Sequence, residues 1–250
     1  MWLIKSSIGR KVVMSVTGLA LVLFLTFHAC MNVAALFSAD AYNAICAFLG
    51  ANWYAVAATA ALAALIALHF IFAVILTLQN RKARGDNRYA VSTKVNAGKV
   101  EWASKNMFVL GLIICLGMLL HLWDFWYNMM FAELAGCESQ ISPTDGYGWI
   151  VYNFHDRPNA CIFVVLYLIW LAALWFHLSH GMWSGMQTLG ANGKTWLKRI
   201  KVIGIIWSTV VILMFVVVVV YFALGFGSCG DCASACGEAC QKAAECTAGC

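Results

Sequence analysis

Long apolar stretches, separated by short polar segments, dominate the chain. Five of them are long enough to cross a bilayer, at residues 12–37, 53–79, 106–131, 159–188 and 202–226. A hydrocarbon core about 30 Å thick needs roughly 20 apolar residues per helical crossing. Apolar runs without alternating polar positions favour helices, which satisfy their backbone hydrogen bonds internally. The pattern therefore predicts an all-α integral membrane protein with five transmembrane helices.

Composition agrees with this pattern. Hydrophobic residues make up 63% of the 250 residues and charged residues only 11%, with a mean hydropathy of +0.81; soluble domains are about a quarter charged. The basic, apolar start resembles a signal peptide, but its apolar run is long enough to span and lacks a small-residue cleavage site. We therefore expect it to be the first transmembrane helix.

Basic residues are concentrated in three segments that precede the first helix, join the second to the third and join the fourth to the fifth. These segments hold 14 of the 16 Lys and Arg residues, and Arg157 and Lys242 are the exceptions. The positive-inside rule then predicts a cytoplasmic N-terminus and an extracytoplasmic C-terminus. The net charge of +5 is explained by this topology and gives no support for a nucleic-acid partner.

Histidines recur within the predicted spans. Five of the six lie there, on four of the five predicted helices: His28, His69, His121, His177 and His180. Polar side chains at membrane depth are costly and usually face the bundle interior with a function. A single such histidine could be a hydrogen-bonded packing residue, but four helices that each contribute one indicate a binding site.

Position along the helices predicts two levels of histidines. His28 and His121 each lie 12 residues before an outer acidic residue, which is about 18 Å at a rise of 1.5 Å per residue. His69 and His180 lie 12 and 14 residues before the first basic residue of an inner segment. Two facing pairs inside a helix bundle would each offer two imidazoles to a cofactor.

Haem iron accepts two axial imidazoles, and such a six-coordinate iron suits electron transfer. The chain has no C-x-x-C-H motif, so covalent attachment is not expected. Zinc is the rival, but two histidines without a nearby Cys or carboxylate make a poor zinc site. Gly181, Gly185 and Gly190 follow the fourth-helix histidines and would let a macrocycle or a neighbouring helix approach closely.

Four motifs, FHACMN, ALHFIF, LLHLW and FHLSHGMWSGMQTLG, surround His28, His69, His121 and His180 in that order. Over residues 7–226 the chain resembles the five-helix, single-polypeptide dihaem cytochrome b that anchors succinate:quinone oxidoreductases, including fumarate reductases. The resemblance implies two b-type haems in a bundle of the first four helices. His28 and His121 would bind the distal haem, and His69 and His180 the proximal one. His177 is left without a role.

The same resemblance implies partners and a location. A flavoprotein subunit and an iron–sulfur subunit would bind the cytoplasmic face of a multi-pass protein of the bacterial cytoplasmic membrane. A quinone, menaquinone by expectation, would exchange electrons near the distal haem. Some members carry a Glu two residues before the fourth-helix ligand, where this chain has Leu178. The direction of the succinate–fumarate reaction and the association of two such complexes are left open.

Residues 227–250 form a separate Cys-rich extension after the cytochrome domain of residues 1–226. Six of the chain's 11 cysteines lie there, at Cys229, Cys232, Cys236, Cys240, Cys246 and Cys250. An extracytoplasmic location would favour disulfides, and clustered thiolates could also bind a metal. The spacing matches no established metal pattern, so we assign the extension no function.

Quinone chemistry moves protons with electrons and needs titratable groups nearby. Asp124, one turn beyond His121, is the candidate catalytic residue, with Asp40, Glu133 and Asn32 further out. The competing interpretation of Asp124 is a water-exposed acid at the membrane interface. For the whole chain, the alternatives are the dihaem subunit of a hydrogenase or formate dehydrogenase, and a metal or small-solute transporter.

Overall fold

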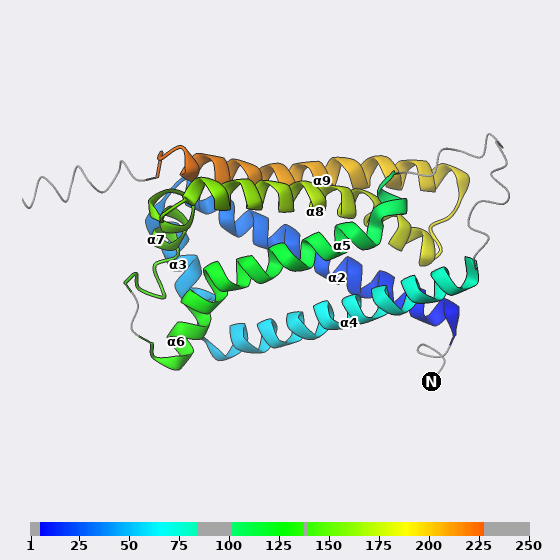
Figure 1. Ribbon diagram of the computed structural model, residues 1–250, viewed down its shortest axis with the longest axis horizontal. Helices are drawn as coiled ribbons and strands as arrows, with labels where there is room; N and C mark the ends of the chain where they lie inside the picture. Colours follow the sequence, from blue (N-terminus) through cyan, green and yellow to red (C-terminus); the bar gives the residue numbers. More distant parts are fainter. Residues whose placement is uncertain (1–5, 85–101, 138–139, 228–250) are drawn as a thin grey trace, which may run out of the picture.

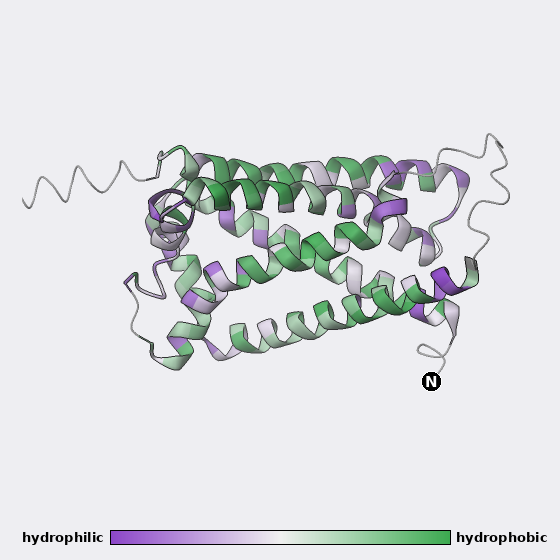
Figure 2. Ribbon diagram, in the orientation of Figure 1, coloured by the Kyte–Doolittle hydropathy of each residue, from purple (hydrophilic) through white to green (hydrophobic). Residues whose placement is uncertain are grey.

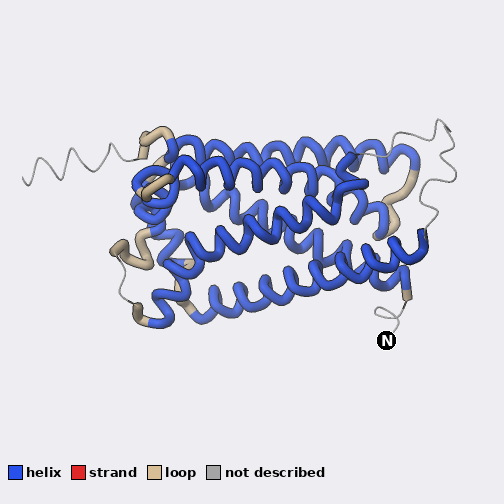
Figure 3. The backbone as a smooth tube through the Cα atoms, in the orientation of Figure 1, coloured by secondary structure: helices blue, strands red, loops and turns tan. Residues whose placement is uncertain are grey.

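The computed structural model describes residues 6–84, 102–137 and 140–227. Within them, five helical segments are long and apolar enough to cross a membrane, which confirms the predicted number. Figure 1 shows them side by side along the length of the molecule, and Figure 3 shows no strand in the described part of the chain. They are α2 (Ser7–Val33), α4 (Trp53–Arg84), α5 (Trp102–His121) with its extensions, α8 (Ala160–Thr188) and α9 (Lys194–Ala223).

The first residues of α2 and α9 show how polar side chains affect where a helix begins. Ser6 precedes α2, and its hydroxyl accepts a 2.9 Å hydrogen bond from the Gly9 amide, which satisfies one of the unpaired donors of the first turn. Helix α9 begins at Lys194 rather than near the predicted residue 202. Lysine and arginine are good helix formers, so the helix extends through this basic segment beyond its apolar part.

The third crossing continues beyond α5 as a π-helix, η2 (Leu122–Phe131), and then as α6 (Ala132–Ala135). A second π-helix, η3 (Tyr152–Asp156), follows the short helix α7 (Gly146–Val151). Both π-helices were missed by the sequence pattern, which assumed the α-helical period. A π-helix closes its hydrogen bonds over five residues and so presents different side chains inward.

Short helices gather at one end of the bundle. Figure 1 shows α3 (Ala39–Phe48) and α7 near the C-terminal end of α9, and α6 at the same end of the bundle, near the start of α4. Asn43 joins two of them, because its amide donates to Asp145 Oδ1 at 2.8 Å and its oxygen accepts from the Tyr147 amide at 2.9 Å. We call this the outer end, in keeping with the predicted topology.

Basic residues gather at the opposite end, which we call the inner end. Hydrophilic residues mark both ends in Figure 2, with apolar residues between them. Of the Lys and Arg residues in the described ranges, Arg157 is the exception at the outer end. The inner-end residues are Arg10, Lys11, Arg81, Lys82, Arg84, Lys105, Lys194, Lys198, Arg199 and Lys201.

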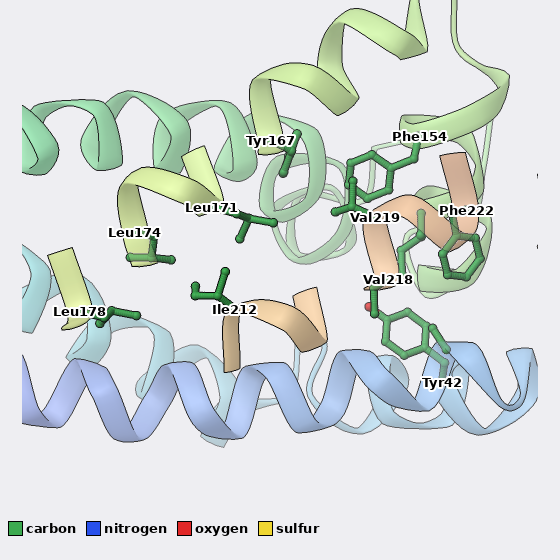
Figure 4. Close-up of a cluster of buried hydrophobic side chains, with 12 residues drawn as sticks. Tyr42, Phe154, Tyr167, Leu171, Leu174, Leu178, Ile212, Val218, Val219 and Phe222 are labelled. Atoms are coloured by element: carbon green, nitrogen blue, oxygen red, sulfur yellow. The ribbon is translucent and has the colours of Figure 1, made fainter. Parts of the chain in front are cut away.

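The apolar core lies mainly between α8 and α9, the pair in most extensive contact. Leu171, Leu174 and Leu178 of α8 lie near Ile212 of α9, and Figure 4 shows this layer of the buried cluster. Helix α2 packs against α8, α9 and α4, whereas α4 packs principally on α2. The Cys-rich extension, from residue 228 onward, is outside the described residues.

Candidate functional site

Four of the histidines form two ring pairs. In the outer pair, His28 of α2 meets His121 at the end of α5, with ring centroids 5.9 Å apart and ring planes at 78°. In the inner pair, His69 of α4 meets His177 of α8, with centroids 6.4 Å apart and planes at 64°. The outer pairing joins the two residues expected from sequence, and the inner pairing does not.

His177 replaces His180 as the ring in contact with His69. His180 lies three residues further along α8, where its ring packs edge-on against Trp183 at 4.8 Å. A methyl group at Gly111 of α5 would lie 3.9 Å from His177 Cε1, an ordinary contact, so His177 also faces α5. His177 therefore faces the bundle interior, and the role of His180 as an axial ligand remains a prediction.

The two pairs are separated along the bundle axis. Thr17 contacts His69, and it precedes His28 on α2 by 11 residues. At about 1.5 Å per residue this places the pairs roughly 16 Å apart. Each pair is thus a separate site, one nearer each end of the bundle.

Each pair contains one ring held by a side chain of α2 and one ring with an unpaired nitrogen. Thr17 Oγ1 lies 3.1 Å from His69 Nδ1, and Asn32 Nδ2 lies 3.4 Å from His28 Nδ1. The Nδ1 atoms of His121 and His177 are buried and make no hydrogen bond within the described structure. A buried nitrogen left unpaired is costly and calls for a ligand or another explanation.

The centroid distances of both pairs match the spacing of two imidazoles on one metal ion. An ion bound by one nitrogen of each ring at about 2 Å would place the ring centroids roughly 6 Å apart. Across the described residues, His, Cys, Asp and Glu do not gather in groups of three or more that could hold a metal ion. Two protein ligands per site suit a haem, whose macrocycle supplies the other four donors, better than zinc.

Aromatic residues surround the outer pair. His28 stacks on Phe24 and contacts Phe215, while His121 contacts Phe125 and Trp170. The indole of Trp170 donates to the Ile114 carbonyl at 3.1 Å and passes directly over Gly117, where a methyl group would collide with it. Gly117 therefore allows Trp170 to reach His121. An apolar, aromatic environment of this kind suits a flat hydrophobic cofactor.

Helix α3 connects to the outer pair through hydrogen bonds. The Tyr42 hydroxyl donates to Asn32 Oδ1 at 3.2 Å, and Asn32 Nδ2 donates to the His28 carbonyl at 2.8 Å. Burial raises the pKa of the Tyr42 phenol and raises that of the neighbouring Cys46 thiol to about 11. Both groups are therefore neutral near pH 7, so Tyr42 acts here as a hydrogen-bond donor.

Asp124 is buried, which makes the interpretation as a water-exposed acid wrong. Only 3% of its surface is exposed. Its Oδ1 lies 3.0 Å from Arg157 Nη1, and its Oδ2 accepts from the Tyr167 hydroxyl at 3.0 Å. Arg157 also donates to Asn153 Oδ1 at 2.8 Å, and Asn153 Nδ2 donates to the Asp124 carbonyl at 3.1 Å. We call these four residues the outer polar cluster.

The two π-helices assemble the outer polar cluster. Asp124 lies in η2 and Asn153 in η3, while Tyr167 comes from α8. The cluster lies beside the outer pair, because the Tyr167 ring also contacts His121 at a centroid distance of 6.4 Å. Both carboxylate oxygens of Asp124 have partners within the cluster.

The remaining predicted residues are dispersed. Asp40 is exposed in the first turn of α3. Glu133 is exposed in α6, and its Oε2 accepts from the Ala51 amide at 3.1 Å. Gly185 lies in ordinary contact distance of Ser15 on α2, as expected for close helix packing, whereas Gly190 has φ +107° and lies in the turn after α8. A turn that needs positive φ explains Gly190 better than close packing does.

Sequence reasoning missed Thr17, Gly18, Arg157 and Tyr167. Arg157 had one detectable signal, since it is a lone basic residue on the side predicted to be poor in them. The others had none, because Thr, Gly and Tyr are common in membrane helices and their partners are distant in sequence.

Comparison of the chain with protein-family models, curated proteins and solved structures gives no match.

The ion pair of the outer polar cluster allows a stability test. Arg157→Met should lower the free energy of unfolding by about 3–5 kcal/mol, because it leaves the Asp124 carboxylate buried without its cation. Adding Asp124→Asn should restore most of this loss, since Asn can still accept from Tyr167. Thermal denaturation in detergent, followed by helical circular dichroism, measures both.

Lys198→Met, at an exposed position of the inner end, is the control and should leave stability unchanged. An Arg157→Met protein as stable as the wild type would contradict the importance of the buried pair.

Proposed function

We propose that the chain is the dihaem cytochrome b membrane anchor of a quinone-linked oxidoreductase, of the succinate:quinone oxidoreductase (succinate dehydrogenase or fumarate reductase) type. The observation that carries this proposal is the presence of two histidine ring pairs inside one membrane-spanning bundle. The four sequence motifs around the histidines support the same family. A transporter is less favoured, because inverted repeats typical of many transporter folds are not visible in the sequence.

The outer haem would be held by His28 and His121, as expected from the sequence. For the inner haem we propose His69 and His177, because these two rings are in contact. His180, the ligand implied by the family resemblance, is the alternative. The two differ by one turn of α8, so the choice changes the position of the inner haem only slightly but changes which side chain binds it.

A b haem held by two histidines would supply one-electron transfer. The protein's own residues would hold the two haems and set the distance between them. Helix α2 contacts one histidine of each pair, His69 through Thr17 and His28 through Asn32. The spacing of roughly 16 Å along α2 sets the distance between the two pairs. The aromatic shell keeps water from the outer pair, which favours electron transfer over reaction with solvent.

Quinone would react near the outer pair, where the structure gathers polar groups at the membrane boundary. The outer polar cluster contacts His121 through Tyr167, and the Tyr42–Asn32 connection contacts His28, so both offer titratable or hydrogen-bonding groups beside the outer pair. The cytoplasmic partners, a flavoprotein and an iron–sulfur subunit, would bind at the basic inner end. The protein itself carries no succinate chemistry in this proposal.

Haem content tests the proposal directly. The purified chain should contain two b haems, measured by a pyridine haemochrome assay and dithionite-reduced spectra. His177→Ala should remove one haem, because it removes the partner of His69, whereas His180→Ala should leave both. His155→Ala, at an exposed histidine outside both pairs, is the control and should retain two.

A wild-type chain without haem would overturn the proposed function. The reverse result, with loss in His180→Ala and retention in His177→Ala, would instead restore the ligand implied by the resemblance.

Electron donors distinguish the proposed family from its alternative. In membranes that contain the assembled complex, succinate should reduce the haems, and fumarate should reoxidise them after reduction by a quinol. A hydrogenase or formate dehydrogenase subunit would respond to hydrogen or formate instead. Optical difference spectra measure each case, and reduction by formate alone would contradict the assignment to succinate and fumarate.

The role of Asp124 in quinone turnover can be separated from its role in the ion pair. Asp124→Asn should slow quinone turnover several-fold while both haems remain. The double variant Asp124→Asn, Arg157→Met removes the unpaired charge, so recovered stability with turnover still slow would support a direct role of the carboxylate. Recovery of turnover in the double variant would assign Asp124 a structural role and remove it from the quinone site.

A further inference from the structure

Thr17 is a buried polar residue beside the inner pair that the proposed mechanism does not yet use. It lies on α2 and exposes only 4% of its surface. Its hydroxyl oxygen is 3.1 Å from Nδ1 of His69 on α4, 52 positions away in the sequence. The contact therefore joins two helices at the level of the inner site.

The hydroxyl proton of Thr17 is used within its own helix. Thr17 Oγ1 donates to the Val13 carbonyl at 2.9 Å, with the Met14 carbonyl at 3.1 Å as a second acceptor. A hydroxyl has one proton and two acceptor lone pairs. The contact with His69 is then one in which the ring Nδ1–H donates to Thr17. The Met14 carbonyl also hydrogen-bonds the His69 ring, so the hydroxyl and this carbonyl lie on the same side of it. In a neutral imidazole, a proton on Nδ1 leaves Nε2 unprotonated, with a lone pair available for a metal.

Gly18, the next residue, gives the His69 ring its space. A methyl group at Gly18 would lie 3.1 Å from His69 Cε1, which is closer than ordinary van der Waals contact. The absent side chain thus admits the ring while the neighbouring hydroxyl holds one of its nitrogens. We call these two residues the Thr17–Gly18 cradle.

We infer that the Thr17–Gly18 cradle is the positioning element for the inner haem ligand His69. This inference rests on the proposed function. Thr17, together with the Met14 carbonyl, favours the tautomer in which Nε2 can bind iron, and by accepting from Nδ1–H it makes the ring a stronger donor. Partners of this kind orient metal-binding histidines, and their loss typically weakens metal binding about 10–100-fold.

Thr17→Val tests the hydrogen bond, because valine keeps the shape and removes the hydroxyl. The inner haem should bind about 10–100-fold more weakly, so that haem content falls from two toward one per chain. Any inner haem that remains should have an upward-shifted midpoint potential and altered electron paramagnetic resonance g-values, because a weaker donor stabilises ferric iron less. Thr17→Ser, which keeps the hydroxyl, should restore haem content and spectra.

Thr26→Val is the matched control for the hydroxyl. Thr26 lies on the same helix, and its hydroxyl bonds to the Val22 carbonyl in the same way. It should leave both haems and their potentials unchanged. Comparison of the two variants therefore separates the contact with His69 from the general effect of removing a helix-bonded hydroxyl.

Gly18→Ala tests the space for the ring, with Gly111→Ala as its control. An added methyl at Gly18 would push His69 Cε1 away by a few tenths of an ångström, whereas one at Gly111 would make only ordinary contact with His177, at 3.9 Å. Gly18→Ala should therefore bind the inner haem more weakly than the wild type, and Gly111→Ala should bind it unchanged.

If Thr17→Val keeps two haems with unchanged potentials and g-values, the positioning role of the Thr17–Gly18 cradle is overturned, while the proposed function is left intact. Loss of both haems in that variant would also count against it, since the outer site should be independent. A wild-type chain without haem would overturn the proposed function and the cradle together.

Discussion

A polar side chain in the middle of a membrane-spanning helix has to find its partner inside the protein, because hydrocarbon offers none. Helix α2 meets this requirement for both histidine pairs. Thr17 contacts His69 near the inner end, and Asn32 contacts His28 near the outer end. The histidines opposite them, His121 and His177, each keep a buried nitrogen that is unpaired among the described residues. The bundle is thus arranged around one supporting helix and two incompletely satisfied sites.

At the outer end, a buried charged side chain also finds its partners within the protein. A buried carboxylate, Asp124, is satisfied by Arg157 and Tyr167, so that no charge in this group lacks a partner. Two π-helices, η2 and η3, carry Asp124 and Asn153, and their wider hydrogen-bond period changes which side chains face inward. This cluster contacts the outer pair through the Tyr167 ring. Its hydrogen bonds join η2 and η3 to each other and to α8.

Several features of the fold and the site follow from the amino-acid sequence alone. Five apolar runs predicted the five long helices, and the level of His28 and His121 relative to the outer acidic residues predicted their pairing. The sequence did not indicate that His177, rather than His180, has its ring in contact with His69. Three residues on a helix differ by about 60° in direction, so both could face inward, and depth estimated from loop charges has an uncertainty of about one turn. The beginning of α9 was misplaced because hydropathy marks the apolar part of a helix and basic residues continue it.

The sequence by itself determined the all-helical fold class, the number of long apolar helices, the end at which basic residues collect and the helices that carry histidines. These follow from local hydropathy and charge, which act over one helix at a time. The tertiary structure decided which histidine meets His69, how Thr17 and Gly18 receive its ring, and how Arg157 reaches Asp124. Those contacts join positions far apart in the chain. They depend on helix rotation, π-helical turns and the space left by a missing side chain, and none of these leaves a periodic signal in the sequence.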